Sequence, residues 1–340
     1  MLRYLTAGES HGKYLAGILE GFPAGVKVGR SYIAGQLRRR RQAPGRSARQ
    51  ALETDAFEIA SGVAGDVTTG APITVLIENK GRALPAPSSL PRPGHADLAG
   101  MLKYNTFNAS LIRERASARE TAARVALGSF ALRLNELLGI DINSRVVSLG
   151  TLSSLTAAAA AAELARARRA GDTLGGVFEI TAEGLPAGLG DFTQRDRRLG
   201  ARLASALLGI NGVKGFEIGG GFGLAGLGGI AAAAKPELSG GLDGGMTNGR
   251  ALTLRCAVKP VPGLPAGAPA TDLRSFKKKL YVSKTSDTTA VFAAAVVAEH
   301  AAALELADAL LEKFGGDSLA EIKPRVDEWR KTTGKILNRL

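Results

Sequence analysis

The chain begins with two apolar runs, residues 1–7 and 13–21, that flank the short turn Gly8-Glu9-Ser10-His11-Gly12. The first run alternates apolar and polar residues, and the glycines interrupt the pattern, so the segment predicts two buried elements joined by a tight turn. His11 lies in this turn beside a Ser-Glu pair, and the chain has only three histidines. A histidine in this position is a candidate for chemistry, although imidazole also forms ordinary hydrogen bonds in turns.

Composition limits how the rest of the chain can pack. Hydrophobic residues make up 45% of the chain and aromatic residues only 5%, so the core must consist mainly of Ala, Leu, Val and Ile. A chain of 340 residues can form two lobes or one large domain with an internal duplication. These features favour a compact α/β or α+β enzyme. The single cysteine, Cys256, and the lack of a basic-then-apolar leader or a long apolar run favour a soluble cytoplasmic protein.

Local patterns predict most of the regular elements. After the opening strand and turn, strands are expected at residues 57–63, 73–78 and 251–258, and helices at about 28–41, 113–138, 157–169, 195–208, 291–314 and 320–340. A linker rich in Gly, Pro and Ser follows the second of these strands, over residues 81–93. Residues 219–249 contain so much glycine that we expect a flexible loop near a ligand, with disorder as the competing explanation.

The charge balance indicates an anionic ligand. The chain carries 44 Lys and Arg against 31 Asp and Glu, a formal net charge of +13, which attracts nucleic acid, a phosphorylated metabolite or a phosphate-bearing cofactor. The basic residues gather at Arg38–Arg41, Arg46, Arg49, between Arg113 and Arg124, and at Lys277–Lys279. Nucleic-acid binders often place aromatic residues among such clusters, and none occur within these. The pattern therefore favours small anions, although the basic loop 43–49 is also compatible with a solvated turn.

Five more residues have both a functional and a structural explanation. His95 lies in a second glycine-containing turn, Arg92–Asp97, just before a carboxylate. Ser117 and Glu120 have capping-box spacing, and a helix start carrying arginines also suits a phosphate or carboxylate. Asp287 precedes a predicted helix and is its N-cap or a site carboxylate, two roles that are compatible. His300 lies among apolar helix residues and is expected to be structural. Metal-ligand clusters, a phosphate-binding P-loop and a serine-hydrolase elbow are absent from the sequence.

Several short blocks then identify a family. They are Gly8–Gly12, Arg92–Asp97, Glu114–Thr121, Gly171–Gly176, Gly184–Gly190, Gly244–Gly249, Lys259–Pro260 and Leu311–Ser318. In this order along residues 1–319 they resemble the chorismate synthase family. The resemblance implies one α+β domain over residues 1–340, a β-α-β sandwich with central helices between two antiparallel four-stranded sheets, an internal pseudo-duplication, and a helical tail at residues 320–340. It also implies a homotetramer.

The family resemblance implies a reaction and a cofactor. The reaction is an anti-1,4 elimination that removes phosphate and a ring proton from 5-enolpyruvylshikimate 3-phosphate and gives chorismate. Reduced FMN is required, and it is thought to lend an electron to the breaking C–O bond and to recover it afterwards. The substrate and FMN are both multiply anionic, which accounts for the basic surplus without nucleic acid. A membrane or metal partner is not implied.

The same resemblance implies roles for individual residues. His11 corresponds to the histidine near the departing phosphate, His95 to the one beside the flavin, and Asp287 to a proton relay near the flavin N5. The expected substrate-binding residues are Ser10, Arg40, Arg46 and Arg119, of which Arg40 and Arg46 are associated with the anionic substrate or the NADP reductant. The expected FMN contacts are Arg115, Ala116, Ser117, Asn211, Gly212, Gly244, Lys259, Pro260, Val261, Pro262 and Gly263.

Some positions depart from the family pattern. The family usually has arginine at positions occupied here by Ser110 and Thr285, and the loop over residues 223–241 lacks two further basic runs. Each lost charge-assisted hydrogen bond is worth about 1.5–3 kcal/mol. Two hypotheses follow, an active chorismate synthase and a diverged member of the fold with weakened flavin or substrate binding. A basic nucleic-acid-binding protein is a third, remote alternative.

Overall fold

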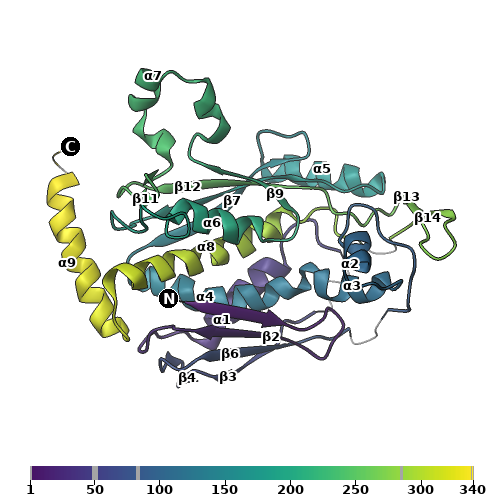
Figure 1. The fold of residues 1–340 in the computed structure, drawn as a ribbon, viewed down its shortest axis with the longest axis horizontal. Helices are drawn as coiled ribbons and strands as arrows, with labels where there is room; N and C mark the ends of the chain where they lie inside the picture. Colours follow the sequence, from purple (N-terminus) through teal and green to yellow (C-terminus); the bar gives the residue numbers. More distant parts are fainter. Residues whose placement is uncertain (1, 48–52, 82–84, 284–285, 338, 340) are drawn as a thin grey trace.

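The computed structural model describes residues 2–47, 53–81, 85–283, 286–337 and 339. Two antiparallel four-stranded sheets enclose a layer of helices, as Figure 1 shows. The first sheet has the order β1-β2-β6-β3 and the second the order β7-β8-β12-β9. The strands are β1 (Arg3–Ala7), β2 (Tyr14–Glu20), β3 (Phe57–Ser61), β6 (Ile73–Glu78), β7 (Asp141–Leu149), β8 (Gly176–Glu183), β9 (Val213–Ile218) and β12 (Leu252–Val258). The expected α+β sandwich is confirmed.

The two sheets have the same topology. In the first sheet β1 pairs with β2, β6 lies beside β2, and β3 lies at the edge. In the second sheet β7 pairs with β8, β12 lies beside β8, and β9 lies at the edge. A helix enters each half between its second and third strands, and another follows the fourth strand. This repeated arrangement supports the proposed internal duplication.

The sandwich core consists of four helices: α1 (Arg30–Arg41), α4 (Thr121–Leu137), α6 (Leu199–Leu208) and α8 (Val291–Phe314). α4 and α8 lie side by side between the sheets and bury alanine-rich faces, because small side chains let helix axes approach closely. The helices approach closely at Gly128, since a Cβ atom there would lie 2.6 Å from the Cβ of His300. The low aromatic content predicted a core of this kind.

The remaining elements lie around the sandwich. The other helices are α2 (Asp97–Lys103), α3 (Ala109–Ala116), α5 (Ala157–Arg169), α7 (Gly229–Ala233) and α9 (Leu319–Leu337), with short 3₁₀ turns η2 (Ala118–Glu120), η3 (Gly221–Gly226) and η4 (Pro236–Ser239). Three small hairpins are β4 (Val63–Ala64) with β5 (Val67–Thr68), β10 (Leu242–Asp243) with β11 (Met246–Thr247), and β13 (Ala268–Thr271) with β14 (Lys278–Tyr281). Among the described residues, no helix is both long and apolar enough to cross a membrane.

Some predicted elements have different limits. The expected helix over residues 113–138 is two helices, α3 and α4, because the backbone of Ser117 is extended and ends the first of them. The helix expected from residue 195 begins at Leu199. The glycine-rich tract 219–249 contains η3, α7, η4 and the β10–β11 hairpin, and α7 lies on an arm that projects from the second sheet (Figure 1). The flexibility of this tract stays a prediction.

His300 has the structural position that its helix pattern indicated. Its side chain is fully buried in α8, and Nδ1 donates to the carbonyl of Val296 at 2.7 Å. Burial lowers the pKa of His300 below its ordinary value, and this effect exceeds the opposing attraction of Glu299. The imidazole is therefore neutral in the folded protein.

We expect this neutral histidine to make folding sensitive to mild acid. In the unfolded chain His300 takes up a proton as the pH falls through about 6.5, whereas the folded chain resists protonation to lower pH. The contribution of neutral His300 to the free energy of unfolding is therefore fully present above pH 6.5. Below that pH the free energy of unfolding falls, by up to about 1.4 kcal/mol per pH unit. Urea unfolding at pH 8, 6 and 5 should show a shallower pH dependence for His300→Asn than for the unaltered protein, and equal slopes would refute this assignment.

Candidate active site

The turn that carries His11 joins β1 to β2 and rests against α3. Nδ1 of His11 lies 2.7 Å from Oε1 of Glu114, and the backbone N–H of His11 donates to Oε2 of the same carboxylate at 2.7 Å. The backbone N–H of Ser10 donates to the Glu114 carbonyl at 3.0 Å. The Glu114 side chain is only 5% exposed, against 15% for His11. One residue of α3 therefore holds both the backbone and the ring of His11.

The same turn is anchored from the opposite side by Asn79. Its side-chain amide donates to the carbonyls of Glu9 and Gly12, at 3.0 and 2.9 Å. Gly8 has φ +103°, and a Cβ atom there would lie 2.4 Å from the carbonyl oxygen of Tyr14. Only glycine fits this position, which explains why the turn begins with one.

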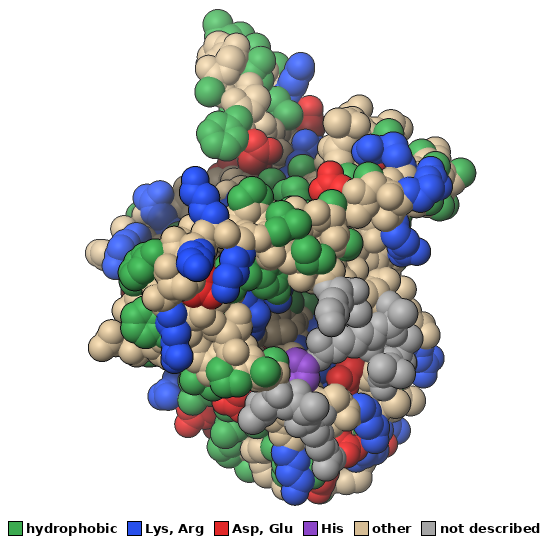
Figure 2. All heavy atoms as spheres, turned by 90° about the vertical axis from the view of Figure 1, so that its right-hand side faces the viewer, with side chains coloured by type: hydrophobic (Ala, Val, Ile, Leu, Met, Phe, Trp, Pro, Cys, Tyr) green, Lys and Arg blue, Asp and Glu red, His purple; other side chains and the backbone are tan. Residues whose placement is uncertain are grey.

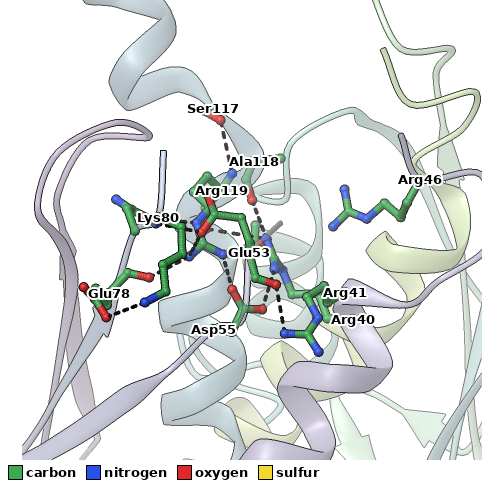
Figure 3. Close-up of polar contacts among 12 residues, drawn as sticks. Arg40, Arg41, Arg46, Glu53, Asp55, Glu78, Lys80, Ser117, Ala118 and Arg119 are labelled. Carbon is green, nitrogen blue, oxygen red and sulfur yellow. Dashed lines mark hydrogen bonds and ion pairs between the residues drawn. The ribbon is translucent and has the colours of Figure 1, made fainter. Parts of the chain in front are cut away.

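Arg119 connects Asn79 to a buried charge cluster, drawn in Figure 3. Nε of Arg119 donates to Oδ1 of Asn79 at 2.9 Å, while its terminal nitrogens pair with Asp55 and with Glu53. Asp55 has φ +52° and is 3% exposed. Arg119 was expected to bind substrate, but the structure places its guanidinium among protein partners that support the turn.

Arg40 reaches the same cluster from the last turn of α1. Nε donates to Oγ1 of Thr121 at 2.9 Å, and Nη1 lies 3.6 Å from Oδ2 of Asp55. Burial, reinforced by the charge of Arg46, lowers the pKa of the Arg40 guanidinium to about 9, so it stays charged at neutral pH. Among the described residues, Nη1 of Arg40 has no hydrogen-bond partner, and the same holds for Nε of Arg46. These buried donors suit an anion.

Arg46 pairs with Asp287 rather than with the cluster around Asp55. Nη1 of Arg46 lies 2.7 Å from Oδ2 of Asp287, and the backbone N–H of Ser47 donates to Oδ1 at 2.7 Å. The expectation that Asp287 caps α8 is wrong, because Ala290 occupies the N-cap position. The ion pair draws the Asp287 carboxylate to the basic loop, where it is 14% exposed.

His95 has a carboxylate partner of its own. Nδ1 lies 2.5 Å from Oδ1 of Asp97, and Oδ2 of Asp97 accepts from Nε of Arg113 at 2.6 Å. Burial alone would raise the pKa of Asp97, but the hydrogen bonds from His95, Arg92 and Arg113 outweigh it and hold the pKa below its ordinary value. This carboxylate is ionised and fully buried.

The β13–β14 hairpin is joined to the His95 turn through Tyr281. Arg92 and Arg113 both stack on its ring, at 5.6 and 5.1 Å from the centroid, and Nε of Arg92 donates to the Tyr281 hydroxyl at 3.2 Å. Sequence patterns missed this hairpin, so they also missed Tyr281 as a support of the site.

The Lys259–Gly263 segment lies against the same turn. Nζ of Lys259 donates to the carbonyl of Gly94, and Cβ of Pro262 is 3.6 Å from the point where a Gly94 Cβ would lie. Burial and the nearby charge of Lys214 lower the pKa of Lys259. Gly263 packs on Ser286, and a Cβ atom added to Gly263 would lie only 2.7 Å from the Ser286 hydroxyl oxygen. The expected group Lys259, Pro260, Val261, Pro262 and Gly263 thus follows β12 into the region of His95.

Asn211 lies at a surface hollow, and it and its neighbour Gly212 contact segments next to the two histidine turns. Its side chain donates to the carbonyl of Ala116 at 3.2 Å, and the neighbouring Gly212 accepts from the backbone N–H of Lys259 at 2.9 Å. A hollow of about 260 Å³ beside this contact is lined by Arg115, Glu120, Arg124, Gly209, Ile210 and Asn211. Figure 2, which views the molecule from the right-hand side of Figure 1, shows a recess with a histidine at its edge and basic side chains around it.

The break between α3 and η2 corrects one expectation. Ser117 caps η2 by accepting from the backbone N–H of Arg119 at 3.3 Å. Glu120 does not complete a capping box, because its carboxylate binds Thr6 and Arg124 instead. Arg115 belongs to the last turn of α3, where it donates to Thr6, and therefore does not lie at a helix N-terminus.

Gly244 lies apart from the other predicted site residues. It forms the β10–β11 turn with φ +60°, next to Phe192. Figure 1 shows β11 at the opposite end of the second sheet from α2 and α3. Of the other expected residues, Ser10, Arg119 and Lys259 have contacts that lead to one of the two histidine turns, whereas Arg46 and Asp287 pair with one another. Among the described residues, no group of three or more His, Cys, Asp or Glu side chains could hold a metal ion.

Comparison with known proteins agrees with this arrangement. The family description "Chorismate synthase" matches residues 2–311. The chain belongs to the chorismate synthase family. A chorismate synthase of Mycobacterium avium (strain 104) is 41% identical over 98% of both chains, and one of Desulforamulus reducens is 42% identical over 99% of this chain and all of the relative.

Solved structures give the same result for the fold. A structure described as "Crystal Structure of Chorismate Synthase" superposes with a TM-score of 0.79 at 34% identity and covers 97% of this chain and 98% of that one. The Mycobacterium avium alignment extends over 391 positions, more than the 340 residues of this chain, so that chorismate synthase has segments that are missing here.

The departures from the family pattern have different structural settings. Ser110 is 3% exposed, and its hydroxyl donates to the carbonyl of Ala86 at 2.7 Å. Asn108 caps α3 by accepting from the backbone N–H of Ser110. Thr285 lies outside the described residues. Residues 223–229 belong to the projecting arm, where Leu227 is 38% exposed.

Proposed function

We propose that this protein is a chorismate synthase that eliminates phosphate from 5-enolpyruvylshikimate 3-phosphate. One observation carries the proposal: in a chain of this family, two histidines are each held by a buried carboxylate, and Arg40 and Arg46 each have a buried N–H without a hydrogen-bond partner among the described residues. A multiply anionic substrate would supply the acceptors that those groups lack. A phosphate leaving group also needs a proton donor or strong hydrogen bond, which a histidine can provide.

The proposed cofactor is reduced FMN, held near His95. The residues present fit an anionic group, because Arg115, Arg124 and Asn211 line a hollow beside the Ala116 carbonyl, and the Glu120 carboxylate that also lines it is paired with Arg124. Lys259 adds a cation at the His95 turn. When bound, reduced FMN would lend an electron to the breaking C–O bond and recover it as the ring proton leaves. Gly244 could contribute only from another copy or after a rearrangement, since it lies at the far end of the second sheet.

In the proposed mechanism the chain itself binds the substrate and moves protons. Arg40 and Arg46 would each offer an anionic group of the substrate one N–H that lacks a hydrogen-bond partner among the described residues, in addition to their ion pairs with Asp55 and Asp287. His11 donates a proton or hydrogen bond to the departing phosphate, which removes the penalty of forming a free trianion. His95 would donate a proton or hydrogen bond on the cofactor side, and Asp287, which pairs with Arg46, would accept a proton.

The assembly and location that we propose follow the family. We propose a homotetramer in the cytoplasm. Several large apolar side chains are exposed on α2 and α3 and their connection, among them Leu102 at 72% and Leu111 at 60%. Contact with another copy would bury them, which supports an oligomer.

The decisive experiment is an anaerobic assay with reduced FMN and 5-enolpyruvylshikimate 3-phosphate, followed by chorismate absorbance. We expect product at catalytic enzyme concentrations, and none with oxidised FMN alone. A folded protein that gives no product at high concentration would reject the proposal. Calorimetric titration with FMN then separates the alternatives, because the diverged member binds weakly, whereas a nucleic-acid-binding protein binds duplex DNA in a salt-sensitive manner and ignores FMN.

A further inference from the structure

We infer that Glu114 is a positioning residue that fixes the tautomer and direction of the His11 ring, and that α3 holds both histidines of the site. The inference rests on the proposed role of His11. It starts from two consecutive residues of α3: Glu114 binds His11 directly, whereas Arg113 binds Asp97, which binds His95.

The tautomer follows from hydrogen-bond chemistry. An ionised carboxylate can only accept, so the 2.7 Å contact between Oε1 of Glu114 and Nδ1 of His11 requires a proton on Nδ1. Oε2 is occupied by the backbone N–H of His11 at 2.7 Å. Proton exchange between His11 and a ligand must therefore pass through Nε2.

Burial and hydrogen bonds hold the Glu114 side chain in this position. Its side chain is 5% exposed, its carbonyl receives the Ser10 N–H at 3.0 Å, and its two carboxylate oxygens contact the same residue, His11. Asn79 holds the far side of the turn. The ring is thus fixed on a backbone that is itself fixed, which is what a proton donor aimed at one atom of a substrate needs.

The two histidine pairs differ in their surrounding charge. Asp97 has Arg113 at 2.6 Å as a second cationic partner. Among the described residues, the ion-pair partner of Glu114 is His11. The negative charge of Glu114 is therefore directed at the His11 ring, where it offsets the positive charge of the proton-donating form.

The Glu114→Gln variant tests whether Glu114 orients the His11 ring or only stabilises the fold. The glutamine carbonyl must still accept from the backbone N–H of His11, because the opposite orientation would place two donors together. The amide NH₂ then faces Nδ1, which must become an acceptor. The proton of neutral His11 moves to Nε2.

The first readout is the ring tautomer of the ligand-free protein, from ¹⁵N chemical shifts of labelled histidine, assigned with a His11→Ala variant. We expect Nδ1–H in the unaltered protein and Nε2–H in Glu114→Gln. Retention of Nδ1–H in the variant would overturn the inference. This outcome does not depend on activity, so it remains informative even if the proposed reaction fails.

The second readout is a double-mutant cycle in the anaerobic assay. Glu114→Gln should lower kcat by about 10²-fold or more, with a smaller change in KM, and should have almost no further effect in the His11→Ala background. Additive losses would show that Glu114 does not act through His11. Glu299→Gln is the matched control, because Glu299 is 1% exposed and pairs with Arg39 far along the chain from the turn. It should keep kcat.

Discussion

Replacing His11 by alanine is expected to lower kcat by about 10²- to 10⁴-fold, the usual contribution of one positioned proton donor. In the proposed mechanism, the departing phosphate would lose the group that neutralises its developing charge. The fold should survive, because the backbone N–H of residue 11 still donates to Oε2 of Glu114 and the Ser10 N–H still donates to its carbonyl. Single-turnover measurement of chorismate formation gives the rate.

The matched control is His300→Asn, which also removes a histidine but lies inside α8. It should change stability and leave kcat near that of the unaltered protein. The thermal midpoint of His11→Ala, followed by circular dichroism, should fall, because the buried Glu114 carboxylate loses its ring partner, but the variant should remain folded at the assay temperature. If His11→Ala turns over at the original rate, the histidine has no part in the elimination.

Replacing Asp55 by asparagine is expected to lower the free energy of unfolding by about 3–5 kcal/mol, the range for breaking a buried ion pair from one side. Asp55 is the buried carboxylate between Arg40 and Arg119, and both guanidinium groups are nearly inaccessible to solvent. The substitution keeps the size of the side chain and its tolerance of a left-handed backbone, here φ +52°. The loss is therefore electrostatic.

Asp66→Asn is the control for the Asp55 variant. Asp66 also has a left-handed backbone, with φ +65°, but its side chain is exposed in the β4–β5 turn. The same chemical change there should alter the free energy of unfolding by less than about 0.5 kcal/mol. Urea unfolding of the two variants at one protein concentration measures the difference, and equal losses would mean that the buried pair is not the cause.

Sequence patterns predicted the elements whose signal is local. The limits of α5, α8 and β6 were predicted correctly, because an alanine run, a long apolar helix pattern and a period-two strand need no distant partner. The β13–β14 hairpin was missed, since its residues show no clear alternation and its strands form through pairing with each other.

Predicting the site depended more on tertiary contacts. The turn histidines were visible as candidates, but Glu114 is 103 positions away from His11, and nothing in either segment indicates that they meet. Asp55 was missed for the same reason, because its partners come from α1 and η2. Asp287 was assigned a possible capping role from its position before a helix, and the long-range ion pair with Arg46 prevailed.

The central position of α8 has a consequence for how the chain reaches this fold. α8 comes late in the sequence, at Val291–Phe314, yet it packs against α1, α4, β7 and β8, and its Glu299 pairs with Arg39. During synthesis, the face of α4 that α8 covers therefore stays uncovered until residues 138–314 have emerged from the ribosome. Closure of the core is a late, long-range event, which slows folding and leaves that face exposed to aggregation until α8 arrives.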